Sequence, residues 1–128
     1  MVDVPDFYQE SFHKKSNRGK PRHCVECGGL IEPGTFYAMA KGKWSGGFGY
    51  FMFHLTCHDV ALKAWKWHRD AIDAYDEGPA IGELLEWAQE ELRESKAIPP
   101  YWPEGYGVTK IGLQRYERDT RCTPNNGH

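Results

Sequence analysis

The chain has 128 residues, enough for one domain, and its 40% hydrophobic and 14% aromatic residues exclude an intrinsically disordered composition. The net charge of −2 is unevenly distributed along the chain. Residues 11–69 carry ten Lys or Arg against three Asp or Glu, whereas residues 70–104 carry ten Asp or Glu against two Lys or Arg. No apolar run approaches about 18 residues, and the start lacks the charged and apolar segments of a secretory signal, so we expect a cytoplasmic protein without membrane contact.

The first 22 residues predict a basic N-terminal arm, because the segment 13–22 is basic and has few apolar residues. Phe7, Tyr8 and Phe12 could attach the beginning of this arm to the domain. The arm is either a solvated tail or a segment that contacts nucleic acid, and its composition does not decide between the two. Its cations are Lys14, Lys15, Arg18, Lys20 and Arg22.

Residues 23–57 predict a metal-dependent β unit. The segment Cys24-Val-Glu-Cys27-Gly-Gly has the form of a zinc knuckle, in which the glycines allow a tight turn after the second cysteine. Apolar residues alternate with a period of two over 35–41, which predicts a strand. A glycine-rich loop is expected over 42–47, and an aromatic strand over 48–53 then returns the chain to the knuckle.

The rest of the chain predicts helices. Apolar residues at three- and four-residue spacing predict a first helix over 58–76, which completes a finger domain spanning 23–76, and a second, acidic helix over about 80–96. We expect residues 77–118 to hold this second helix and an irregular extension, since the proline-rich stretch 99–103 is not helical and 108–116 fits either a short strand or a helix. Residues 119–128 predict a flexible tail.

Two ligand pairs, with the spacing Cys-x2-Cys-x26-His-x2-Cys, predict one structural zinc site. In a reducing compartment such cysteine clusters usually mean metal rather than disulfides. The second pair falls where the hairpin leads into the helix, whose N-terminal dipole favours a thiolate. The predicted ligands of this Cys3His site are Cys24, Cys27, His54 and Cys57, and they would bind one Zn²⁺ ion.

Other roles for these residues and their neighbours remain open. His58 adjoins Cys57 and could replace His54, although only His54 has the x2 spacing. His23 is expected to lie outside the ligand set, and Cys122 to be a free thiol. The cysteines could also be buried free thiols, whereas a redox pair is disfavoured because the motif precedes Gly-Gly and a hairpin rather than the helix of a βαβ unit.

Residues 22–67 resemble two groups of zinc proteins, through the motifs Cys24-Val-Glu-Cys27, Ile31-Glu-Pro-Gly34, Trp44 and Phe53-His54-Leu-Thr-Cys57. One is the poly(ADP-ribose) polymerase-type finger, which has this ligand order and a long hairpin insert and recognises DNA breaks. The other is a loose group of small phage and prophage proteins that share a Pro-Gly-x-x-Tyr strand and a Gly-Lys-Trp turn. The resemblance implies a treble-clef finger, which would act in the host cytoplasm if it is phage-encoded. With the helical pattern and the prolines that follow, the expected fold is a small α+β domain that consists of this finger, a second helix and an irregular C-terminal segment.

We expect a binding module rather than an enzyme. An HNH-like nuclease, the third possibility considered, needs a general-base His beside an Asn, and each Asn of the chain lies outside the hairpin–helix unit. Four protein ligands would also leave no open position on the metal for a reactive water.

The favoured partner is nucleic acid, either DNA or RNA, contacted through a basic front face. The alternative is a host protein that a phage-type protein would inhibit or adapt, with the acidic helix meeting a basic groove. Trp44 would either stack on a base or fold back onto the hairpin. The residues expected to contact the partner are Lys14, Lys15, Arg18, Lys20, Arg22, Lys41, Lys43, Trp44 and Lys66.

Overall fold

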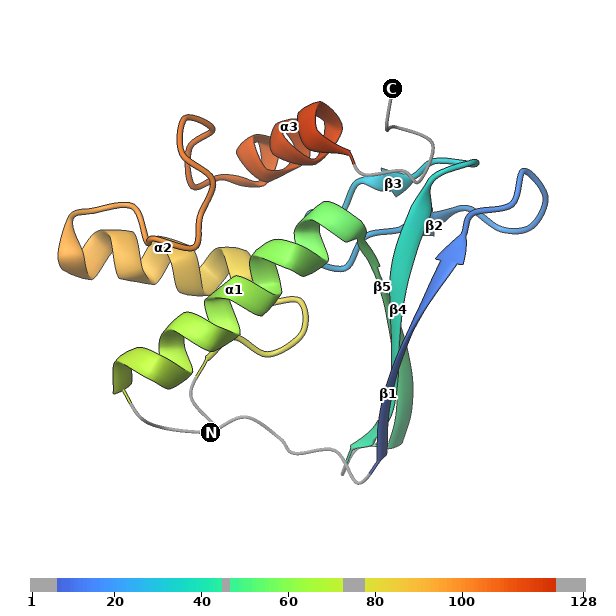
Figure 1. Cartoon of the computed structure of the whole chain (residues 1–128), viewed down its shortest axis with the longest axis horizontal. Helices are drawn as coiled ribbons and strands as arrows, with labels where there is room; N and C mark the ends of the chain where they lie inside the picture. The colour runs from blue at the N-terminus through green and yellow to red at the C-terminus, as the bar shows by residue number, and fades with distance from the viewer. Residues whose placement is uncertain (1–6, 45–46, 73–77, 122–128) are drawn as a thin grey trace.

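A computed structural model describes residues 7–44, 47–72 and 78–121. These residues form an α+β structure with a three-stranded sheet, a two-stranded ribbon and three helices, so the α+β part of the expected fold class is confirmed (Figure 1). In chain order the elements are β1 (Phe7–Lys14), β2 (Arg22–His23), β3 (Leu30–Ile31), β4 (Phe36–Trp44), β5 (Gly47–His54), α1 (Leu55–Ile72), α2 (Leu84–Ser95) and α3 (Lys110–Thr120). None of the described helices is long and apolar enough to cross a membrane.

The larger sheet has the strand order β1-β4-β5, and both neighbouring pairs are antiparallel. The alternation expected in β4 is confirmed, because Ala38 and Ala40 are buried in the core together with Phe53 of β5. The strands are longer than predicted, since β4 continues to Trp44 and β5 begins at Gly47. Most of the expected loop over 42–47 is therefore paired strand, because its glycines do not prevent backbone pairing.

The prediction of an arm over residues 1–22 is wrong for β1, which pairs with β4 along its whole length, from Phe7 opposite Lys43 to Lys14 opposite Phe36. The pairing continues in two backbone hydrogen bonds, because the Lys15 N–H donates to the Thr35 carbonyl and the Gly34 N–H donates to the Lys15 carbonyl, each at 2.8 Å. The basic segment 13–22 suggested an arm, whereas the backbone bonds of β1 to β4 do not depend on which side chains the strand carries. Residues 1–6 of the expected arm lie outside the described part of the chain.

Both predicted helices are present but begin at different residues from those expected, and the expected end of the first, over 73–76, lies outside the described residues. Helix α1 starts three residues earlier than expected, directly after β5, whereas α2 starts later, at Leu84. Of the two structures that fitted 108–116, the helix is the one present, because Lys110–Thr120 form α3. The expected irregular C-terminal segment is therefore partly helical, and the prediction of a tail from 119 is wrong for 119–120. Thr109 caps α3, because its side chain accepts a hydrogen bond from the Gly112 N–H at 2.9 Å.

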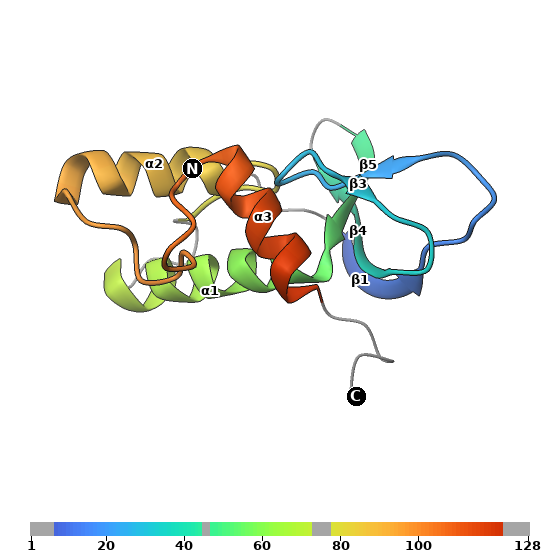
Figure 2. The same cartoon turned by 90° about the horizontal axis from the view of Figure 1, so that it is seen from above.

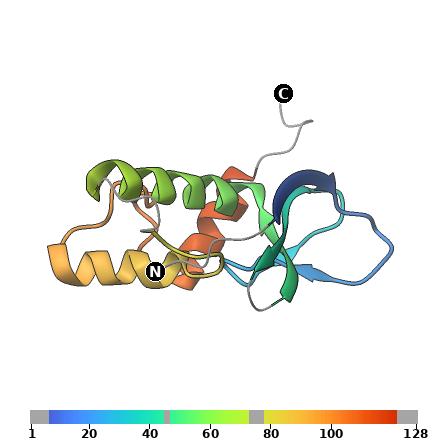
Figure 3. The ribbon, with the colours of Figure 1, turned by 90° about the horizontal axis from the view of Figure 1, so that it is seen from below.

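The core begins between the sheet and α1 and continues among the helices. Val60 and Ala64 of α1 are buried in one cluster with Leu84 of α2 and Leu113 of α3. Viewed from above and from below, α1 and α2 run side by side and α3 lies across them, with all three to one side of the sheet (Figures 2 and 3). The Cys3His site lies where the knuckle, the end of β5 and the start of α1 meet.

Candidate metal centre

The first ligand pair is held by the β2–β3 ribbon. Its two strands pair directly, and between them the Cys24 N–H donates to the Gly29 carbonyl at 2.9 Å, while the Gly28 N–H donates to the Cys24 carbonyl at 2.8 Å. Gly28 adopts a φ of 75°, a conformation that glycine enters without steric cost. The turn therefore points both cysteines of the knuckle to the same side.

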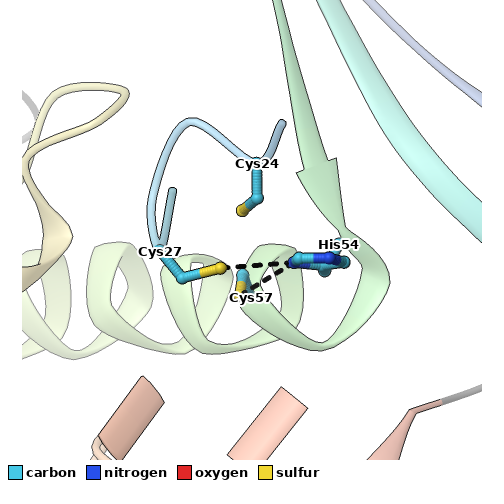
Figure 4. A group of neighbouring side chains, drawn as sticks. All are labelled: Cys24, Cys27, His54 and Cys57. Carbon is cyan, nitrogen blue, oxygen red and sulfur yellow. Dashed lines mark hydrogen bonds between the residues drawn. The ribbon is translucent and has the colours of Figure 1, made fainter. Parts of the chain in front are cut away.

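The second pair is placed by the junction of β5 and α1. His54 is the last residue of β5, and Cys57 lies in the first turn of α1. The knuckle is joined to β5 by a hydrogen bond of 2.8 Å from the Val25 N–H to the Met52 carbonyl. As a result the side chains of both pairs point toward one another (Figure 4).

The four predicted ligands form one compact cluster. Their ligand atoms all lie within 4.8 Å of one another, and all four residues are buried. The Nδ1 atom of His54 is 3.3 Å from the sulfur of Cys27 and 3.9 Å from that of Cys57. Bonds of about 2.3 Å to sulfur and about 2.0–2.1 Å to nitrogen would place tetrahedral ligand atoms roughly 3.5–3.8 Å apart. The cluster is thus able to hold one metal ion.

The imidazole of His54 is oriented by contacts on its other side. Its Nε2 atom lies 3.0 Å from the Leu30 carbonyl oxygen and 3.7 Å from Oε1 of Glu117, a buried residue of α3. A proton on Nε2 suits both oxygens and leaves Nδ1 as the atom that faces the sulfurs. Such outer partners of a metal-binding His set its tautomer and raise its basicity.

The electrostatics of the cluster favour a cation. Hydrogen bonds from the thiols of Cys24 and Cys57 lower the pKa of Cys27 to about 4, helped by the Gly29 N–H. The same thiol neighbours and burial raise the pKa of Cys57, because a second negative charge here is repelled by the first. Burial disfavours a charged His54, but Cys24, the Leu30 carbonyl and Glu117 outweigh it and raise the pKa of this imidazole. A bound dication would relieve the repulsion and allow all three thiols to ionise.

The neighbouring candidates lie elsewhere. The His58 ring is buried outside the cluster, with Nε2 3.0 Å from Oε2 of Glu10 and with Phe12 and Phe53 packed against it edge-on. His23 is exposed in β2, and Cys122 lies outside the described residues. The structure therefore assembles His54, and not His58, with the three cysteines.

Three polar contacts to the knuckle and to His54 were not anticipated from the sequence. Glu26 accepts hydrogen bonds from the N–H groups at the start of α2, Gln114 of α3 donates to the Cys27 carbonyl at 2.8 Å, and Glu117 of α3 approaches His54. Each joins residues more than 50 positions apart, so no spacing along the chain could have indicated them. Through them α2 and α3 attach to the metal centre.

The residues expected to contact a partner are dispersed. Lys41 and Lys43 lie on the outer face of the sheet, which is the face turned away from α1. This outer face is formed by the odd-numbered residues of β1 and β4 and the even-numbered residues of β5. Lys66 is exposed on α1, beside a cleft of about 480 Å³ that it lines with Trp67 and Tyr101, so it is not brought together with these two lysines.

The cations of the expected arm differ among themselves. Lys14, Arg18 and Lys20 are exposed, whereas Arg22 is partly buried in β2. Lys15 is buried, with its ammonium group donating to the Ser16 carbonyl at 2.7 Å, so it is not available as a surface contact. The side chain of Trp44 lies outside the described part of the chain.

Comparisons with known proteins do not assign the chain to a family. A scan of family models and searches of curated proteins and of solved structures found no match to the chain. The resemblance to polymerase-type and phage-type fingers stays a prediction that rests on the ligand order and motifs.

Proposed function

We propose that this chain is a zinc-stabilised module that binds nucleic acid without catalysing a reaction. The choice of metal follows from donor chemistry, because three sulfurs and one imidazole nitrogen in a closed site are the ligands of structural Zn²⁺. The order of knuckle, β4–β5 hairpin and α1 around the site supports a treble-clef finger as part of the proposal. The similarity to polymerase-type and phage-type fingers belongs to the same proposal.

The charge of the outer face carries the nucleic-acid part of the proposal. Lys41 and Lys43 are both exposed on its central strand, and none of the side chains that the structure describes on this face is Asp or Glu. Lysines neutralise phosphates and release condensed counterions, which favours binding of any nucleic acid. Lys14, Arg18 and Lys20 add exposed cations at the end of β1 and in the loop that follows.

A non-catalytic role fits the Cys3His site. Four protein ligands complete a tetrahedral zinc shell, so water has no coordination position from which it could be activated. The zinc would stabilise the fold that presents the outer face rather than act on a substrate.

The exposed glutamates of α2 favour one other function. Glu86, Glu90 and Glu94 are exposed on this helix, and their charge would complement a basic protein surface. In this alternative the chain would inhibit or adapt a host protein, as a phage-type protein does.

Fluorescence anisotropy with labelled single- and double-stranded DNA and RNA tests the proposal. We expect affinity to fall steeply with salt, and the double variant Lys41→Gln/Lys43→Gln to bind more weakly and to reduce the slope of log K against log salt by about 0.7 per lysine on single strands. Lys96→Gln, which removes an exposed charge from the end of α2, is the matched control and should change neither.

Absence of binding to every nucleic acid at low salt would contradict the proposal. Capture of a defined host protein from a nuclease-treated lysate, lost when Glu86, Glu90 and Glu94 are replaced by Gln, would then support the protein-binding alternative.

A further inference from the structure

Two exposed aromatic rings stand beside the two lysines of the outer face. In the register of β4 and β5, Lys43 is opposite Phe48 and Lys41 is opposite Tyr50. Phe48 is 78% exposed and Tyr50 is 61% exposed. Because directly opposite residues have Cβ atoms about 4.5–5.5 Å apart, each ring has a lysine side chain as its neighbour.

On β4 and β5 the outer face is closed toward the metal site, whereas Gln9 and His13 of β1 are exposed on the same face. Tyr37 and His54 are opposite each other and both are buried, the second of them within the Cys3His site. Met39 and Met52, the next opposite pair, are half-buried. On β4 and β5 the open area thus begins beyond the methionines and coincides with the two rows that each combine an aromatic ring with a lysine, and Gln9 of β1, opposite Lys41, extends it.

We infer that this open area binds single-stranded nucleic acid, with neighbouring bases stacked on Tyr50 and Phe48 and the phosphates held by Lys41 and Lys43. The inference rests on the function proposed above and narrows it to one class of ligand. Residues two apart in a strand point to the same face about 6.8 Å apart, so the rings are two separate platforms. Stacking requires base faces that are free, and a single strand has these while a duplex hides them.

The combination of groups is what selects this ligand. A single exposed ring is common on protein surfaces and needs no explanation. Here two rings alternate along one strand, each faces a lysine, and no carboxylate lies among the described side chains of the same face. Such a surface suits a ligand with apolar faces and regularly spaced negative charges.

The test uses the zinc-loaded full chain and four variants of the rings. Tyr50→Leu and Phe48→Leu keep apolar area but remove the aromatic face, whereas Tyr50→Phe and Phe48→Tyr keep it. The probes are fluorescein-labelled dT12, U12 and a blunt DNA hairpin duplex, titrated at two salt concentrations. Ile111→Ala, which alters an exposed apolar residue on α3, is the control for loss of surface area.

We expect wild type to bind the single strands at least about tenfold more tightly than the duplex, because only the single strands can stack. Each Leu variant should lose roughly 5- to 150-fold in single-strand affinity, while the salt slope, duplex binding and zinc content stay unchanged. Tyr50→Phe, Phe48→Tyr and Ile111→Ala should bind as wild type does.

Two results would overturn the inference, and they differ in what they leave standing. Salt-sensitive binding of equal strength to duplex and single strands, unaffected by the Leu variants, would refute base stacking but retain the proposed function. No binding to any probe at low salt would refute both.

Discussion

The carboxylate of Glu26 accepts a hydrogen bond of 3.1 Å from the backbone N–H of Leu84, although the two residues are 58 positions apart in the sequence. The same carboxylate accepts a second bond, of 2.8 Å, from the Gly82 N–H. A residue between two metal ligands thus caps the start of α2, whose own N-cap residue, Glu83, makes no side-chain capping bond.

Replacing Glu26 should therefore loosen α2 without removing the metal. We expect Glu26→Ala to lower the free energy of unfolding of the zinc-loaded protein by about 1–3 kcal/mol, because it leaves two N–H groups without an acceptor. Burial raises the pKa of Glu26 to about 7, so the neutral but hydrogen-bonding Glu26→Gln should cost clearly less. Urea denaturation with parallel zinc analysis measures both, and Glu94→Ala, exposed on α2, should be silent.

The two histidines near Cys57 should differ in their effect on zinc retention when each is replaced by Ala. His54→Ala should lower zinc retention severely, because it removes a ligand from a site whose binding free energy is coupled to folding. His58→Ala should keep one zinc per chain and lose only the contacts with Glu10 and the packed rings. Elemental analysis after gel filtration distinguishes the two, and retention by the first variant with loss by the second would refute the ligand choice.

Replacing the cysteines one at a time should show which of them bind the metal. Cys24→Ser, Cys27→Ser and Cys57→Ser should each give metal-poor protein, and a chelator should abolish the cooperative unfolding of wild type. Cys122→Ser is the matched control and should retain its zinc, so metal loss in that variant would contradict the proposed site.

Glu117 should tune the metal affinity through His54. Outer partners of ligating histidines typically contribute 10–100-fold, so we expect Glu117→Gln to weaken zinc binding by about that factor in competition with a chromophoric chelator. Glu32→Gln is the matched control, because Glu32 shares the partner Arg121, at 2.6 Å, but does not approach His54. Equal loss in both variants would assign the effect to Arg121 instead.

Zinc affinity should fall as the pH falls. The pKa of Cys57 is raised by its thiol neighbours, and that of His54 is raised despite burial, so at neutral pH protons compete with the metal at these ligands. The pKa of Cys27 is lowered by hydrogen bonds from the other two thiols, so this ligand contributes less to the competition. We expect at least about tenfold weaker binding per pH unit below neutrality, because at least one proton must leave for each ion bound. Calorimetry in two buffers of different ionisation enthalpy counts these protons, and a release of none would contradict the prediction.

Gly112 should tolerate no side chain. A Cβ at this position would collide with the backbone carbonyl oxygens of Tyr106 and Gly107, which cannot move as a flexible side chain could. We expect Gly112→Ala to destabilise the protein by about 1–3 kcal/mol in thermal denaturation. Ile111→Ala, on the exposed side of the same helix, should change stability far less.

Local patterns in the sequence predicted the parts of this structure that depend on neighbours along the chain. The cysteine and histidine spacing indicated the cluster, and the period-two alternation around Ala38 indicated the β4–β5 hairpin. Strand β1 was missed because an edge strand needs only backbone pairing, which leaves little mark on composition. The contacts of Glu26 and Glu117 could not be predicted, because they depend on where α2 and α3 dock.

The attachment of the helices to the knuckle has a consequence for the order of assembly. All four ligands lie within the first 57 residues, so a growing chain would possess its complete metal site before α2 and α3 had been synthesised. Each later helix then contacts residues of the metal site that the bound ion has already fixed in place. Helix α2 contacts Glu26, and α3 contacts Cys27 and His54. Folding during synthesis proceeds from the N-terminal side, and here the metal would act as the template on which the C-terminal half is built.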